Sequence, residues 1–160
     1  MLSRVFSPII IFNIVLIFSF SVSTNHFVNL PNINIAFYIF FHITLIYILF
    51  FYYHYSIFLL VFFYGILMDI FLINLIGVHL FCFILLTIVF LICKKYLFLL
   101  SSFQITCAIF ITLILTLFLE ILIAYLLNNI YFNLNLIFKY LFLSIIIFIP
   151  SIFLLNKIDS

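Results

Sequence analysis

"GILMDIFLINLIGVHL", residues 65–80, contains both glycines of the chain and one of its three acidic residues within an otherwise almost wholly apolar run. The i to i+4 spacing places Gly65 and Asp69 on one helix face, where a glycine lets a neighbouring helix approach closely. We therefore expect the Asp69 carboxylate to face protein, either meeting a partner or capping a neighbouring backbone. Gly77 falls where the chain must reverse within few residues, and glycine permits the backbone angles of such a turn. His79 then lies in the first turn of the next helix.

The rest of the chain is equally apolar. Of its 160 residues, 71% are hydrophobic and 5% are charged, with a formal net charge of +2. So few charges cannot solvate the surface of a soluble globule and cannot form a nucleic-acid footprint. A membrane-spanning helix needs about 20 apolar residues, because each residue rises about 1.5 Å and the hydrocarbon core is about 30 Å thick. The sequence predicts an all-α polytopic membrane protein with the lipid bilayer, and no nucleic acid, as a partner.

Breaks at Asn, Ser, Pro, Lys and clustered Tyr divide the chain into six expected helices, which form a single transmembrane domain over residues 1–160. These helices cover residues 7–22, 33–51, 56–73, 77–93, 103–127 and 136–155. Pro8 and Pro31 suit first-turn positions, and Pro150 lies inside the last helix and should kink it. The cut at "FYYHYS" rests on the preference of Tyr and His for the headgroup layer.

The N-terminal segment also resembles a secretory signal, because Arg4 precedes an apolar run that ends in the small residues of "SVS". Five further spans follow, so we expect this segment to be retained as the first helix.

Lys and Arg favour the cytoplasmic side of short loops, which allows the orientation to be predicted. With six spans and the N-terminus inside, only Lys139 lies towards the outer side, while the other basic residues are cytoplasmic: Arg4, Lys94, Lys95 and Lys157. We expect a multi-pass protein of the inner (plasma) membrane with both termini in the cytoplasm. The loops are short, so any function lies in helix faces or in very short loops.

Three charged side chains fall inside the expected spans, and placing each at the bilayer centre costs roughly 2.5 to 3.5 kcal/mol on insertion scales. In this topology Asp69, Glu120 and Lys139 all lie in the outer half of the bilayer. The matching depth allows one cluster in the bundle interior, in which the ammonium offsets part of the carboxylate desolvation. Alternatively, the side chains reach the interface separately. His42, in the middle of the second helix, either takes part in a proton relay or makes an interhelical hydrogen bond.

The sequence offers no set of residues for catalysis or metal binding. Cys82, Cys93 and Cys107 match no zinc or redox spacing, and we expect them to be small buried hydrophobic residues. No H-E-x-x-H or G-x-S-x-G motif occurs, and serines such as Ser101 and Ser144 lack a matched base. We expect no enzyme activity, no cofactor and no metal.

The order Gly65, three apolar residues, Asp69, a short break, Gly77, one apolar residue and His79 resembles the signature of the rod shape-determining protein MreD family. The similarity extends to "LPNIN" before the second helix, to the basic pair "KK" that closes the fourth, and to "FIPSIFLLNKID" around Pro150. The chain departs from the family pattern between Asp69 and Gly77, where members usually carry small residues.

This resemblance implies a six-helix inner-membrane fold similar to the substrate-binding (S) components of energy-coupling factor vitamin transporters. It also implies a non-catalytic role in the bacterial elongasome. There the protein binds the membrane-anchored MreC protein, and through it couples MreB filaments to RodA and a penicillin-binding transpeptidase during lateral peptidoglycan synthesis. The residues singled out as structural or partner-binding candidates are Gly65, Asp69, Gly77, His79, Glu120, Lys139 and Pro150.

Two other functions compete with the scaffold. A small-molecule carrier, or the substrate-binding subunit of a membrane transporter, would need an outer cavity lined by Asp69, Glu120 and Lys139, to which His42 could be added. A proton-conducting subunit would need ionisable groups at several depths, whereas the inner half offers little beyond Asn13 and His42.

Overall fold

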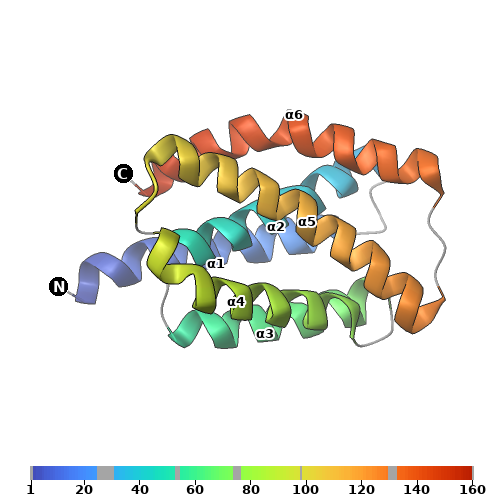
Figure 1. Cartoon of the computed structure of the whole chain (residues 1–160), viewed down its shortest axis with the longest axis horizontal. Helices are drawn as coiled ribbons and strands as arrows, with labels where there is room; N and C mark the ends of the chain where they lie inside the picture. Colours follow the sequence, from blue (N-terminus) through green and yellow to red (C-terminus); the bar gives the residue numbers. More distant parts are fainter. Residues whose placement is uncertain are drawn as a thin grey trace. The chain divides into compact units, whose positions relative to one another are not determined.

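The computed structural model describes residues 2–24, 31–52, 55–73, 77–97, 99–129 and 133–159; within them, the side chains of residues 2–9, 31, 55–56, 73, 94–95 and 128 are not described. Over these ranges the chain is all-α, as predicted, and contains no strand. The helices are α1 (Leu2–Ser23), α2 (Pro31–Phe51), α3 (Tyr55–Met68), α4 (Val78–Leu97), α5 (Ser102–Asn128) and α6 (Leu134–Asp159) (Figure 1). A π-helical turn, η1 (Asp69–Ile73), continues α3 without a break.

Each expected helix corresponds to one observed helix, and most are longer than expected. Pro31 is the first residue of α2, as predicted, and α6 continues on both sides of Pro150. The prediction for Pro8 was wrong, because α1 begins at Leu2 rather than at Ser7 and Pro8 therefore lies inside it. The φ angle that the proline ring imposes is helical, so an interior proline costs mainly one backbone hydrogen bond and some crowding of the preceding turn.

Three helices are long and apolar enough to cross a membrane. These spans are Asn32–Phe51, Ser102–Leu127 and Leu134–Asp159. Among the residues whose side chains are described, the other apolar helical segments are shorter, at Ile10–Ser23, Ile57–Leu72 and Val78–Cys93. Helices satisfy their own backbone groups, which is what a hydrocarbon environment demands. The described residues therefore indicate a membrane protein.

The helices fall into two compact units. The first unit contains residues 1–48 and 135–160, which supply α1, most of α2 and α6. The second unit contains residues 49–134, which supply α3, η1, α4 and α5.

In the first unit, α1 runs antiparallel to α2. The ring of Phe12 lies 5.6 Å from that of Tyr47, and the ring of Phe18 lies 5.8 Å from that of Phe37. From Phe12 to Phe18 the chain of α1 advances, while its partners in α2 go back from Tyr47 to Phe37. The two helices therefore run in opposite directions.

In the same unit, α6 runs parallel to α2. The rings of Tyr38 and Tyr140, both early in their helices, lie 5.9 Å apart in an edge-to-face arrangement. Near the other ends, the Tyr47 hydroxyl donates a hydrogen bond to Asn156 Oδ1 at 2.9 Å and a longer one to Asp159 Oδ2 at 3.3 Å. Buried Ser144 and Ser151 place small side chains on the inner face of α6.

The cysteines do not share one environment. Cys82 is fully buried in α4, but Cys93 is half-buried and Cys107 is exposed on α5. The expectation of a buried side chain was therefore wrong for Cys107, which lies on the same exposed face as Phe103 and Ile111. In a membrane helix an apolar thiol on this face meets lipid, so it has no need of a protein core.

Candidate functional site

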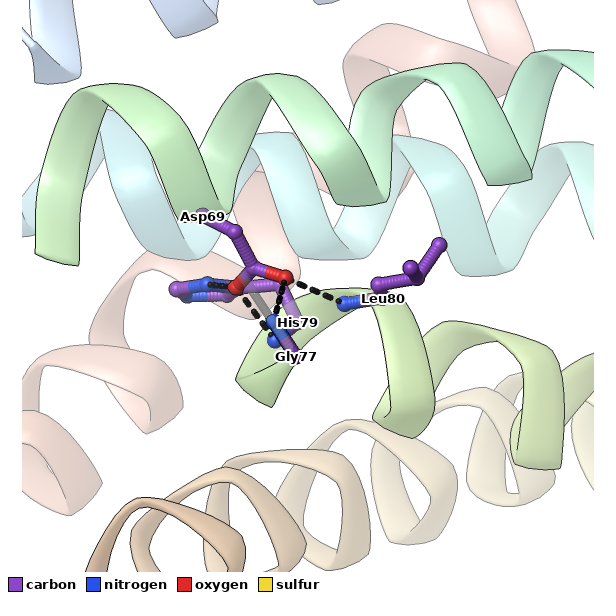
Figure 2. Close-up of polar contacts among 4 residues, drawn as sticks. All are labelled: Asp69, Gly77, His79 and Leu80. Carbon is purple, nitrogen blue, oxygen red and sulfur yellow. Dashed lines mark hydrogen bonds and ion pairs between the residues drawn. The ribbon is translucent and has the colours of Figure 1, made fainter. Parts of the chain in front are cut away.

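The strongest polar constellation in the described residues surrounds the Asp69 carboxylate. Oδ1 accepts hydrogen bonds from the backbone N–H of His79 at 2.8 Å and from His79 Nδ1 at 2.9 Å. Oδ2 accepts hydrogen bonds from the backbone N–H groups of Gly77 at 2.7 Å and Leu80 at 3.2 Å (Figure 2). We refer to Asp69, Gly77, His79 and Leu80 as the Asp69 cap.

The Asp69 cap solves a problem common to all helix N-termini. The first N–H groups of a helix have no partner within it, and the helix dipole makes this end attractive to an anion. A side chain next to the helix start usually supplies the acceptor, but here the acceptor comes from the preceding helix, eight to eleven residues earlier in the chain. The expectation that Asp69 caps a neighbouring backbone is confirmed.

His79 contributes a donor from its side chain as well as from its backbone. The two side chains are buried, with 0% of Asp69 and 3% of His79 exposed. A carboxylate only accepts hydrogen bonds, so when Asp69 is ionised Nδ1 carries the hydrogen and donates it. The imidazole also packs against the ring of Phe83, one turn further along α4, at a centroid distance of 6.2 Å.

Gly65 allows the backbones of α3 and α4 to touch. A Cβ atom built on Gly65 would lie 2.8 Å from the Cα of Leu80, which is closer than real contacts permit. The close approach expected at this glycine is therefore confirmed. It brings the N–H of Leu80 to the carboxylate of Asp69, which lies one turn beyond Gly65 on the same face.

Gly77 serves as the N-cap residue of α4, for a different physical reason. Its φ is +139°, in a region that residues with a side chain rarely adopt. A Cβ atom at Gly77 would lie 3.5 Å from its nearest neighbour, Leu127 Cδ1, which is an ordinary van der Waals contact. Glycine is therefore required by the backbone angle and not by crowding. The carbonyl of Gly77 accepts the N–H of Phe81 at 3.0 Å, the first hydrogen bond of α4. The predicted turn geometry is confirmed.

Glu120 lies on the buried face of α5, with 5% of the side chain exposed. One turn earlier on this face, the backbone carbonyl of Thr116 accepts a weak hydrogen bond from Cys82 Sγ of α4 at 3.6 Å. The donors that Asp69 receives within the described residues all come from residues 77–80. Lys139 is half-buried in α6, which belongs to the other unit, so the three-residue cluster of Asp69, Glu120 and Lys139 stays a prediction.

The remaining candidates lie in the first unit or outside the described residues. His42 is fully buried in α2, and its Nδ1 lies 2.8 Å from the carbonyl of Tyr38 in the preceding turn. Pro150 is exposed on α6. His26 and His54 fall outside the described residues, as do the side chains of three cytoplasmic basic residues of the predicted topology: Arg4, Lys94 and Lys95.

Two hydrogen-bonded arrangements were not predicted. The start of α5 is a capping box, in which Ser101 Oγ accepts from the N–H of Gln104 at 3.5 Å and Gln104 Oε1 accepts from the N–H of Ser101 at 2.8 Å. The sequence "SSFQ" carries the signal for it, a serine followed three residues later by glutamine. The bond from Tyr47 to Asn156 has no such signal, because 109 residues separate the partners.

Within the described residues, no group of three or more His, Cys, Asp or Glu side chains is placed to hold a metal ion. No family model, curated protein or solved structure matches the chain.

Proposed function

We propose that the chain is a six-span inner-membrane scaffold of the MreD family, with both termini in the cytoplasm and a fold similar to that of the S components. In this role it binds an MreC-type membrane anchor through its helices. Through that anchor it links MreB filaments to RodA and a penicillin-binding transpeptidase.

The observation that carries the proposal is the agreement between the signature and the Asp69 cap. The four residues on which the resemblance rests are Gly65, Asp69, Gly77 and His79. Each has a distinct role in one local structure. Gly65 allows the close contact between α3 and α4, and Asp69 is the hydrogen-bond acceptor. Gly77 forms the turn, and His79 donates to the carboxylate from its side chain. A signature that encodes a helix hairpin supports a protein that works through its helix packing.

The arrangement of the first unit supports six spans. When a chain crosses a bilayer repeatedly, successive spans alternate in direction. The parallel run of α2 and α6 then requires an odd number of spans between them, and α3, α4 and α5 supply three. The antiparallel run of α1 against α2 fits the same alternation.

The environment of Asp69 also favours a scaffold over a carrier. A substrate-binding carboxylate needs an oxygen that is accessible to the ligand, but both oxygens of Asp69 already accept two hydrogen bonds from the chain itself. The side chain is fully buried. One of the acids that would line the cavity of a carrier is therefore engaged in holding α3 against α4.

The proposal is tested by depletion and complementation in the native host, together with purification of the tagged protein. We expect depleted cells to become round, and the MreC-type anchor to co-purify with the wild-type protein. Asp69→Leu should fail to restore rods, while Leu59→Ala, at a position that is 74% exposed, should restore them. A depleted strain that stays rod-shaped with normal wall insertion would falsify the proposal. Saturable stabilisation of the purified protein by a small molecule would instead indicate a carrier.

A further inference from the structure

The end of the third helix is wound more widely than its body. α3 is α-helical to Met68, and residues Asp69–Ile73 then form the π-helix η1. π-helices are rare, usually single turns, and occur frequently at functional sites. The neighbouring structure must therefore favour the wide form over the ordinary α-helix.

The hydrogen bonds of the Asp69 cap supply such a constraint. Asp69 is the first residue of η1, and the 2.7 Å bond to its Oδ2 from the N–H of Gly77 closes a ring of backbone that contains the whole of η1. The ring cannot relax by a sliding of the two helices, because Gly65 is in backbone contact with Leu80 one turn before it. The N–H of Leu80 bonds to the same carboxylate (Figure 2).

We propose that the Asp69 carboxylate is a latch that holds η1 in the π form, and that its release lets this turn rewind as α-helix. A π-helix has more residues per turn than the 3.6 of an α-helix, so rewinding rotates the side chains beyond Asp69 relative to α3. The end of the α3–α4 hairpin at which η1 meets α4 is then an element with two arrangements, of the kind that conformational switches use. This inference does not depend on the scaffold role.

The rotation has a defined signature on the exposed face. Ile70 and Phe71 are both exposed in the π form, at 44% and 53%. In a continuous α-helix with 3.6 residues per turn, a residue eleven positions further along lies about three full turns away and therefore on the same face. The exposed face that contains Leu59 would thus also contain Ile70. Rewinding therefore keeps Ile70 on this face and turns Phe71 away from it.

The experiment measures the oxygen accessibility of a nitroxide placed singly at position 70 or 71 of the full-length protein in liposomes, with Cys93→Ser and Cys107→Ser. In the otherwise native protein we expect both labels to be accessible. In Asp69→Leu the accessibility at 71 should fall relative to that at 70, and Asp69→Asn should shift it in the same direction by less. Asp159→Asn, which neutralises an acid of the first unit, should leave the ratio unchanged.

A third label, at the exposed Tyr96 near the end of α4, reports whether each variant keeps its fold. An unchanged ratio in Asp69→Leu, with the signal at position 96 intact, overturns the latch. If Asp69→Leu does not fold, Asp69→Asn decides by the same criterion. Failure of both variants to fold also overturns it, because the carboxylate would then be required for the hairpin itself and not for the form of the turn.

Discussion

Asp69 Oδ1 and His79 Nδ1 lie 2.9 Å apart although ten residues separate them in the chain, and both side chains are buried in apolar helices. The pair joins the end of α3 to the first turn of α4. Because the same carboxylate also accepts three backbone N–H groups, one side chain satisfies most of the N–H groups that have no partner within the helix at its start. The carboxylate of Asp69, the cap of α4 and the close contact between α3 and α4 therefore depend on one another.

Substitution of Asp69 should destabilise the protein more than any other single polar change in the second unit. Asp69→Ala leaves His79 and three N–H groups without their acceptor, and we expect a loss of about 3 kcal/mol in the free energy of unfolding. The measurement is SDS-induced unfolding in mixed micelles, followed by the reaction of a fluorescent maleimide with the buried Cys82 after Cys93→Ser and Cys107→Ser. A loss no larger than that of Asp159→Asn would contradict this role for the carboxylate.

Gly65→Ala tests the backbone contact between α3 and α4. The new methyl group would meet the Cα of Leu80 at 2.8 Å, and we expect a loss of about 2 kcal/mol from overpacking. Since the nearest atom is backbone, shortening the neighbour with Leu80→Ala should not restore stability. Leu59→Ala, on the exposed face of α3, serves as the control, and full rescue by Leu80→Ala would show that only side chains collide.

Gly77→Ala tests the turn independently of crowding. The φ of +139° is unfavourable for alanine while the space around its Cβ is sufficient, so we expect about 2 kcal/mol of destabilisation through the backbone alone. Shortening the neighbouring side chain with Leu127→Ala should therefore not change the effect of Gly77→Ala in the same unfolding assay. Wild-type stability of Gly77→Ala would mean that the turn has an alternative conformation of equal energy.

Tyr47→Phe tests the parallel pairing of α2 and α6. Loss of the hydroxyl removes the hydrogen bonds to Asn156 and Asp159 but keeps the ring beside Phe12, so we expect a loss of about 1 kcal/mol. A double-mutant cycle measures the contact directly: in the Asn156→Ala, Asp159→Ala background, Tyr47→Phe should have almost no further effect. An undiminished effect in that background would place the partner of the hydroxyl elsewhere.

The six-span arrangement predicts the location of both termini and of two internal sites. Alkaline phosphatase fused after Asn129 should be active, because this position follows the fifth span, whereas fusions after Leu99 and at the C-terminus should be inactive. A green fluorescent protein at either end should fluoresce, because the six-span arrangement places both ends in the cytoplasm. Termini on opposite sides of the membrane would remove the depth assignment of Asp69, Glu120 and Lys139.

Much of the local structure was predictable because it depends on residues that are near one another in the sequence. Apolar runs indicate helices, Pro31 marks a helix start, and the spacing of Gly65 and Asp69 places both on one face whatever the partner is. The breaks between helices were also predictable, whereas the start of α1 was not, because Pro8 is compatible with both a helix start and a helix interior.

The identity of the partners could not be predicted in the same way. An aspartate within an apolar run requires compensation, but the requirement is met equally by a lysine, a histidine or a row of N–H groups. The choice of donors on Asp69 depends on where α4 begins and on how closely Leu80 approaches Gly65.

The order of amino acids was enough to establish that the chain is helical and apolar throughout and that Asp69 must face protein, because composition and helical periodicity act residue by residue. The packing of the helices was needed to show that the donors to Asp69 come from residues 77–80, that Cys107 is exposed while Cys82 is buried, and that Tyr47 bonds to Asn156. The physical reason is that nearly every face of these helices is apolar, so the hydrophobic pattern does not distinguish the faces that pack together from those that do not. Backbone contact and hydrogen bonding, which depend on three-dimensional position, make that distinction.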